Sequence, residues 1–88
     1  MNNYSTSFML IGKIRSINST SVPRLVKLKV DNDLYDIEVP VEIFESFKEK
    51  LKVNLTVGMN GRFINRDGKV ILVAKNIIVA KEWIEEME

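Results

Sequence analysis

Residues 34–51, LYDIEVPVEIFESFKEKL, contain the change of hydrophobic period on which the fold assignment depends. From residue 34 to residue 39 apolar and polar side chains alternate, which is typical of a β-strand with one buried face. That face carries Tyr35, Ile37 and Val39. Pro40 ends the strand, because proline cannot donate to a central ladder, and it suits the start of a helix. Apolar residues then recur at helical spacing and predict an amphipathic helix over residues 41–52, with Ile43, Phe44, Phe47 and Leu51 on its buried stripe.

Two further strands are expected before this stretch. Residues 8–17 alternate, with an inward face of Phe8, Leu10, Gly12 and Ile14 and an outward face of Met9, Ile11, Lys13 and Arg15. A glycine in mid-strand indicates a bulge or a bend. Residues 25–30 alternate cleanly, with Val26, Leu28 and Val30 facing inward. The loop NSTSVP (18–23) and the turn DND (31–33) separate these strands.

After the helix, Asn54 is a candidate left-handed stop. A fourth strand is expected over residues 56–64, and NRDG (65–68) is a tight hairpin signal. The fifth strand, residues 69–79, is either continuous or interrupted near Lys75 and Asn76. KEWIEEME at the end of the chain is a short helix or a tail. Three strands, one helix and a two-stranded hairpin predict an all-β protein, a five-stranded antiparallel barrel of the OB type with one α-helix between strands 3 and 4.

The expected organisation is an N-terminal arm (1–7), one barrel domain (8–80) and a short C-terminal segment (81–88). A domain within a chain of 88 residues has a marginal core, and small domains often gain stability from disulfides, metals or oligomerisation. This chain has no cysteine for a disulfide, so oligomerisation is the source of stability left open. The absence of both His and Cys removes the usual general base, two common nucleophiles and classical zinc ligands. We therefore expect no enzyme activity, no metal and no cofactor. Without a signal peptide or a membrane-spanning apolar run, a cytoplasmic protein is expected.

Several stretches resemble the family of bacterial single-stranded DNA-binding proteins. FMLIGKI (8–14) is similar to the first strand of that family, residues 34–51 to its third strand and helix, and GKVILVAKNIIV (68–79) to its fifth strand. LKVNLTVGMNGRF (51–63) resembles the segment between helix and fourth strand without a gap, with Gly58, Gly61 and Arg62 at positions of glycine, glycine and a polar or basic residue. The primosomal protein of the same fold is a similar match. The resemblance covers residues 8–80 and implies single-stranded DNA binding and association through the first strand.

This chain departs from the family in three places. One is the family's flexible tail with an acidic, hydrophobic tip, which is not expected here because WIEEME (83–88) is acidic but too close to the barrel. The family stacks bases on aromatic residues of its second and third strands, where this chain has Leu34, Pro40 and the turn 31–33. The hairpin between strands four and five is also short here, whereas the family has a long DNA-wrapping loop. These departures keep a second hypothesis open, an accessory subunit that binds a replication enzyme such as a polymerase, primase or helicase. RNA binding by the same barrel is a third.

The candidate nucleic-acid-binding residues are basic side chains expected on the outer strand faces: Lys13, Arg15, Lys27, Lys29, Arg62, Arg66, Lys69 and Lys75. They could track a phosphate backbone, or they could be scattered charge on a solvated face. The net charge is only +1, from 13 basic and 12 acidic residues, and Asp36 and Glu38 lie on the same outer face. Phe63 is expected in the core. Trp83 could stack a base, dock a partner or cap the barrel.

Apolar residues on outward faces indicate a surface that another subunit covers. They are Met9, Ile11, Ile71 and Val73, of which the last two face away from Val70 and Leu72. We expect a homo-oligomer, with cover by the N-terminal arm or the C-terminal segment as the alternative. No membrane partner is expected.

Overall fold

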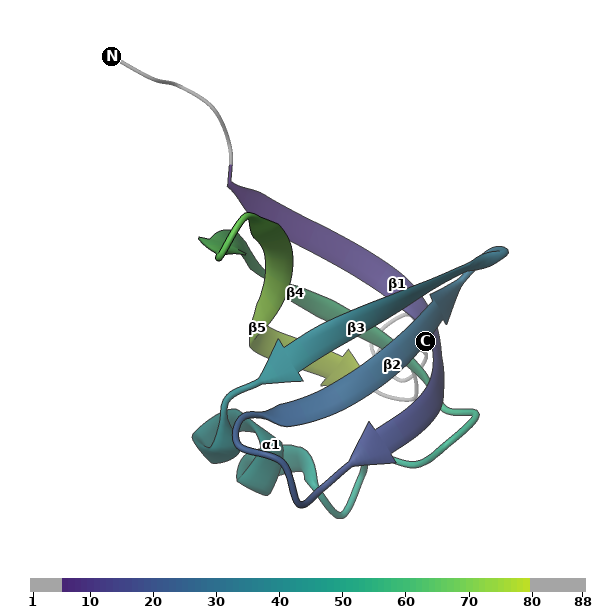
Figure 1. Cartoon of the computed structure of the whole chain (residues 1–88). Helices are drawn as coiled ribbons and strands as arrows, with labels where there is room; N and C mark the ends of the chain where they lie inside the picture. Colours follow the sequence, from purple (N-terminus) through teal and green to yellow (C-terminus); the bar gives the residue numbers. More distant parts are fainter. Residues whose placement is uncertain (1–5, 80–88) are drawn as a thin grey trace.

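The computed structural model describes residues 6–79 (Figure 1). The elements are β1 (Ser7–Asn18), β2 (Arg24–Val30), β3 (Asp33–Val39), α1 (Val41–Phe47), β4 (Thr56–Arg66) and β5 (Lys69–Val79). The strands close a barrel in the order β1-β2-β3-β5-β4, which confirms the predicted fold class. The proposed C-terminal segment with Trp83, and most of the proposed arm, lie outside the described residues.

One strand pairing differs from the predicted antiparallel barrel. Four pairings are antiparallel, but β3 and β5 run parallel and meet at Ile37 opposite Leu72 and at Glu38 opposite Val73. The parallel pair follows from the helix, because a chain that leaves β3 through α1 and returns through the β4–β5 hairpin brings β5 back in the direction of β3. The barrel is therefore mixed.

Strand β1 pairs with two neighbouring strands: its first half pairs with β4 and its second half with β2. The register with β2 shifts between Ile14 and Ser16, so the bulge falls at Arg15 rather than at Gly12. Gly12 has a different role. A Cβ atom at this position would overlap the carbonyl oxygen of Lys29, so the absence of a side chain lets β1 and β2 approach where the barrel closes.

The core lies between the strands and under α1. It contains the predicted inward residues Phe8, Ile14, Val26, Leu28, Ile37, Val39, Phe44 and Leu51, together with Val57, Met59, Ala74, Ile77 and Val79. Tyr35, Phe47 and Leu72 pack against this cluster while partly exposed. The inward faces predicted for the first three strands are thereby confirmed.

The helix is shorter than predicted. α1 ends at Phe47, whose carbonyl oxygen accepts bonds from the backbone N–H groups of Lys50 and Leu51 at 2.8 and 3.0 Å. Asn54 has a positive φ of 76° but does not stop the helix. Its N–H donates to the carbonyl of Ile14 at 2.7 Å, which fixes the turn that leads into β4.

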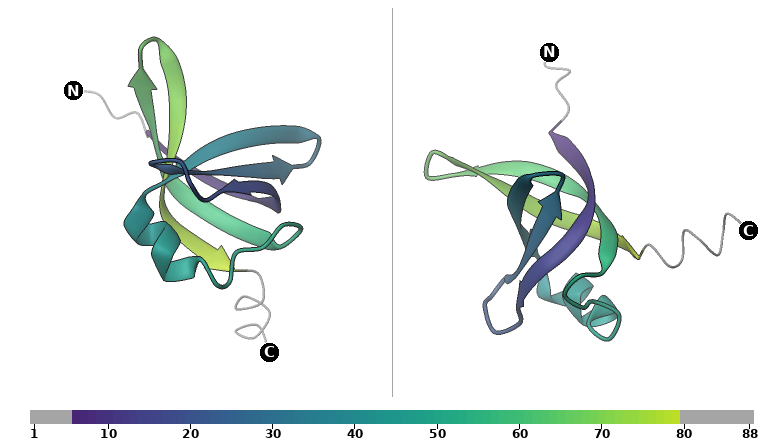
Figure 2. Two further views of the ribbon diagram at one scale, coloured as in Figure 1. Left: turned by 60° about the horizontal axis from the view of Figure 1, so that its bottom comes forward. Right: turned by 90° about the vertical axis from the view of Figure 1, so that its right-hand side faces the viewer.

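The β4–β5 hairpin extends beyond the barrel, away from α1 (Figure 2). Its turn places Asp67 and Gly68 at φ 55° and 81°, the combination of a type I′ turn. Strand β5 is continuous, but the register shifts so that Asn60 faces Asn76 and Gly61 faces Ala74. Lys75 is therefore an extra residue in a bulge, which distorts the strand near Lys75 and Asn76 without interrupting it.

Two residues predicted to face the core are exposed on this hairpin. Phe63 retains 41% of its accessible surface and Val70 retains 68%. Both have inward parity, but the register of β1 with β4 ends at Ser7 opposite Arg62, so the barrel does not continue over them. The expectation that Phe63 is a core residue is wrong for this reason.

Candidate nucleic-acid interface

The eight basic residues selected from the sequence lie on strands, but they do not form one continuous track. Lys13, Lys27 and Lys29 stand on the outward faces of β1 and β2, and Arg15 occupies the β1 bulge. Arg62, Arg66 and Lys69 lie on the projecting hairpin. Lys75 is at the bulge of β5, next to Ala74, whose partner Gly61 directly precedes Arg62.

Lys13 and Lys29 are direct cross-strand partners on the outside of the barrel. Like charges in this arrangement repel one another, and neither lysine forms an ion pair within residues 6–79. Both line a hollow of about 310 Å³ with Ile11, Gly12, Asp31 and Thr56. An anion such as a phosphate would relieve the repulsion, and Asp31 is the one acidic group in the lining.

Two of the eight cations are already neutralised by the acidic side chains of β3. Lys27 Nζ lies 3.7 Å from Asp36 Oδ1, its cross-strand partner. Arg66 donates from both terminal nitrogens to Glu38, at 2.6 and 3.1 Å. The hydrogen bond and the negative charge of Glu38 raise the pKa of Arg66. The sequence identified Asp36 and Glu38 as opposing a basic track, and the structure shows which cations they occupy.

The outward faces of β2 and β3 carry no aromatic residue in the described chain, as the sequence indicated. Their exposed apolar residues are Leu25, at 37% exposure, and Leu34, at 56%. Leu34 stands directly opposite Lys29, so an apolar side chain adjoins the Lys13–Lys29 pair. These two leucines were not singled out as contact residues, because alternation alone does not show that an outward leucine stays uncovered.

The four candidate interface residues fall into two unlike pairs. Met9 and Ile11 are about half exposed, at 49% and 48%. Ile71 and Val73 are partly buried on β5. Val73 pairs with Arg62, and Arg62 pairs with Ser7, so a charged residue separates the two pairs in the sheet.

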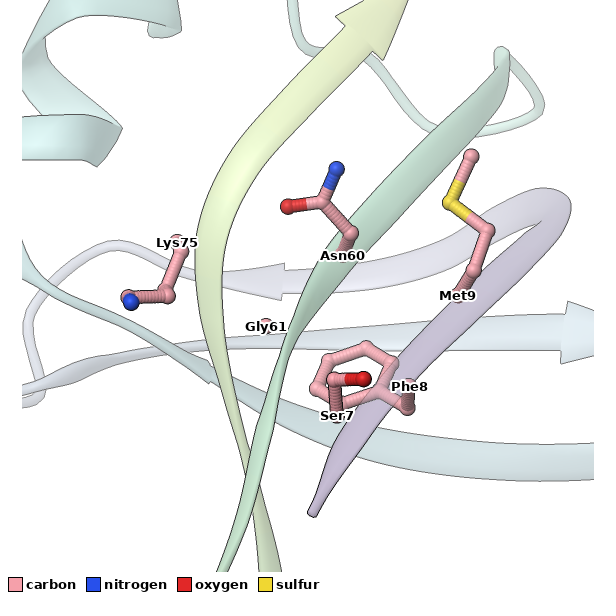
Figure 3. A pocket seen from close by; sticks show the side chains of 6 residues that line it. All are labelled: Ser7, Phe8, Met9, Asn60, Gly61 and Lys75. Carbon is pink, nitrogen blue, oxygen red and sulfur yellow. The ribbon is translucent and has the colours of Figure 1, made fainter. Parts of the chain in front are cut away.

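A second hollow, of about 620 Å³, lies where β1, β4 and the β5 bulge meet (Figure 3). It is lined by Ser7, Phe8, Met9, Asn60, Gly61 and Lys75. Because Lys75 is the bulged residue, its side chain joins this group instead of following the register of its strand. Lys75 and the exposed Met9 lie on opposite sides of the hollow, with Asn60 and Gly61 of β4 between them.

A third groove, of about 700 Å³, separates α1 from the β1–β2 loop. Arg24 lies in it with its guanidinium carbon 5.8 Å from the centre of the Phe44 ring, and one terminal nitrogen donates to the carbonyl of Ser21. Glu45, Lys48 and Glu49 give the rest of the lining mixed charge. This balance fits a polyanion less well than the Lys13–Lys29 hollow does.

In residues 6–79, the part of the chain that the structure describes, no three His, Cys, Asp or Glu side chains gather as metal ligands. No helix in it has the length and hydropathy needed to cross a bilayer.

The closed barrel with α1 between β3 and β4 defines an OB-fold domain. No protein-family model and no curated protein sequence matches the chain. Solved structures are similar to it. A mitochondrial single-stranded DNA-binding protein of S. cerevisiae, Rim1, superposes with a TM-score of 0.73 at 19% identity, over 83% of this chain and 90% of that chain. A second crystal form of Rim1 gives 0.72 at 19% identity, over 84% and 92%.

A further similar structure is the S. pombe Stn1–Ten1 complex. One of its chains superposes with a TM-score of 0.68 at 12% identity, over 92% of this chain and 65% of that chain. Identities this low establish a shared fold, and the roles of individual residues are argued from this chain alone.

Proposed function

We propose that this protein binds single-stranded DNA without strong sequence preference and acts by binding rather than catalysis. The observation that carries the proposal is the Lys13–Lys29 pair beside the exposed Leu34, on the outside of an OB barrel, where neither lysine forms an ion pair within residues 6–79. OB folds hold single strands by combining a positive groove with apolar side chains against the bases. Similarity to Rim1 supports this choice of ligand, as does the resemblance to the bacterial family.

The experiment is a titration of the full-length protein with labelled oligo-dT at low and at moderate salt. We expect binding that weakens as salt rises. Bound lysines and arginines release cations that had condensed on the DNA phosphates, and a higher salt concentration opposes this release. The variant Lys13→Ala/Lys29→Ala removes two phosphate contacts, and its slope of log K against log salt should fall by about 1.4. Lys48→Ala/Lys52→Ala is the matched control, since it also removes two lysines, neither of which lines the Lys13–Lys29 hollow. An equal loss in both variants would contradict a site at Lys13 and Lys29.

A second candidate function is that of an accessory subunit of a replication enzyme. Two observations on β2 and β3 favour it. Asp36 and Glu38 of β3 neutralise Lys27 and Arg66. The outward faces of both strands also lack an aromatic side chain. Similarity to a chain of the Stn1–Ten1 complex agrees with an OB domain that works beside another protein. Absence of oligo-dT binding at low salt, together with co-purification of a replication enzyme, would favour this second function. Competition with oligo-U in the same titration distinguishes DNA from RNA.

A further inference from the structure

Phe63 is an aromatic side chain that the barrel leaves uncovered. Its parity directs it inward, opposite Leu72, but it lies one residue beyond the last register pair of β1 with β4. The ring therefore lies at the rim of the barrel, and 41% of the accessible surface of Phe63 is exposed. The sequence pattern predicted burial, so this aromatic surface becomes apparent only from where β1 begins.

The ring of Phe63 is held in place from two directions. It contacts the buried ring of Phe8, with centroids 5.7 Å apart and planes tilted by 56°. Its backbone N–H donates to the carbonyl of Thr6 at 2.7 Å. A side chain fixed in this way loses little conformational entropy when a ligand stacks on it. Exposed aromatic rings without such support lose more.

The surroundings of Phe63 are apolar on one side of the hairpin and basic on the other. Val70, which is 68% exposed, and Leu72 share the face of Phe63, and Asn65 adds an amide. Residues 62–71 carry three basic side chains, Arg62, Arg66 and Lys69, against one acidic side chain, Asp67. An aromatic and apolar face on a basic hairpin suits a ligand that combines flat rings with negative charge.

We propose that Phe63 is a base-stacking site for single-stranded DNA, with phosphates held by the basic side chains of the β4–β5 hairpin. The site rests on the proposed function and places the aromatic contact at the barrel rim, since β2 and β3 have no outward aromatic residue. Every base has a π-face, so stacking here fits binding without sequence preference. Removal of one stacked aromatic weakens single-strand binding by about 5- to 150-fold.

The test compares Phe63→Leu, Phe63→Trp and wild type in the oligo-dT titration. Leucine keeps an apolar contact with Phe8 but has no ring, so we expect weaker binding at an unchanged salt slope. Tryptophan should bind at least as tightly as wild type. Arg62→Gln should instead lower the salt slope, by about 0.7 for one phosphate. Val53→Ala, at another exposed apolar position in the turn before β4, should change neither quantity.

A fluorescence measurement supplies a direct readout of stacking. Phe63→Trp in a Trp83→Phe background has one tryptophan, whose emission oligo-dT should quench; Val53→Trp in the same background should not be quenched. If wild type binds oligo-dT but Phe63→Leu binds as tightly and Phe63→Trp is not quenched, stacking at Phe63 is refuted and the proposed function stands. If wild type does not bind at low salt, both fail.

Discussion

Gly61 lies at a close approach of β4 and β5, at the register shift beside the Lys75 bulge. A Cβ atom there would overlap the carbonyl oxygen of Val73 and crowd the Cα of Ala74 at 2.8 Å. Both neighbours are backbone atoms of a paired strand, so they cannot rotate away as a side chain can. The bend of β5 into the barrel therefore depends on the absence of a side chain at this position.

We expect Gly61→Ala to lower the free energy of unfolding by about 1–3 kcal/mol, as overpacking of a close contact does. Urea denaturation followed by circular dichroism measures the change. Gly68→Ala is the control, because Gly68 has φ 81° but nothing within 4 Å of the added Cβ. It should cost about 1–2 kcal/mol of backbone strain without packing conflict. If Gly61→Ala left stability unchanged, the proposed role of the close approach would be wrong.

Single residues also show where parity fails as a guide. Alternation predicted the buried state of Ile37 and Val39 correctly, because the rest of the core packs over the inward face of β3 at both positions. The same rule failed for Phe63 and Val70. Parity fixes the direction of a side chain, but burial depends on whether another element continues over it. Phe63 and Val70 are exposed because β1 begins only at Ser7 and does not extend over them. No local pattern in the hairpin sequence indicates where β1 begins.

The β4–β5 hairpin is tied to β3 by the bidentate pair between Arg66 and Glu38. Because this pair occupies the guanidinium, Glu38 competes with any phosphate that approaches Arg66. We expect Glu38→Gln to bind oligo-dT more tightly than wild type and to steepen the salt slope by about 0.7, the equivalent of one added phosphate contact on a single strand. The titration at several salt concentrations measures both effects.

Asp33→Asn is the matched control for this prediction. It also removes one negative charge from β3, but Asp33 forms no ion pair in the described part of the chain. Its effect should be smaller, since it releases no cation. An equal gain from both variants would mean that overall charge, and not the release of Arg66, governs binding.

Elements were predicted well in kind and order, and less well in extent. The strand ending at Pro40, the helix after it and the NRDG turn were all identified from local residues. The helix was predicted to be five residues longer than it is. Leu51 lies at an apolar position that continues the helical period, but the backbone hydrogen bonds after Phe47 form turns. The parallel contact of β3 with β5 has no local signal, because it depends on the path of the intervening chain.

Self-association remains a prediction for the assembled protein, and the structure directs it to Met9 and Ile11. We expect sedimentation of wild type to show an oligomer and the variant Met9→Glu/Ile11→Glu to sediment as a monomer, because burying two carboxylates at an interface is unfavourable. Ile71→Ser/Val73→Ser should keep the oligomer, since these side chains are already partly buried within the subunit. A wild-type monomer at high concentration would disprove the interface.

The candidate site could be predicted only as a set of residue types. Strand parity correctly placed Lys13, Lys29 and Arg66 on outward faces. It could not show that Lys13 faces Lys29 across a ladder or that Arg66 is held by Glu38, because both depend on register between strands distant in sequence. The net charge of +1 likewise conceals which cations are compensated.

The parallel contact between β3 and β5 has a consequence for how the barrel fluctuates. The two strands share only two register pairs, at Ile37–Leu72 and Glu38–Val73, whereas β1 and β4 share seven. Parallel pairing is also slightly weaker per residue. Transient opening should therefore begin along this line and unzip the cylinder into a curved sheet. Amide hydrogen exchange should be faster there than along β1–β4, and faster still in Glu38→Gln, because the Arg66–Glu38 pair bridges the same line.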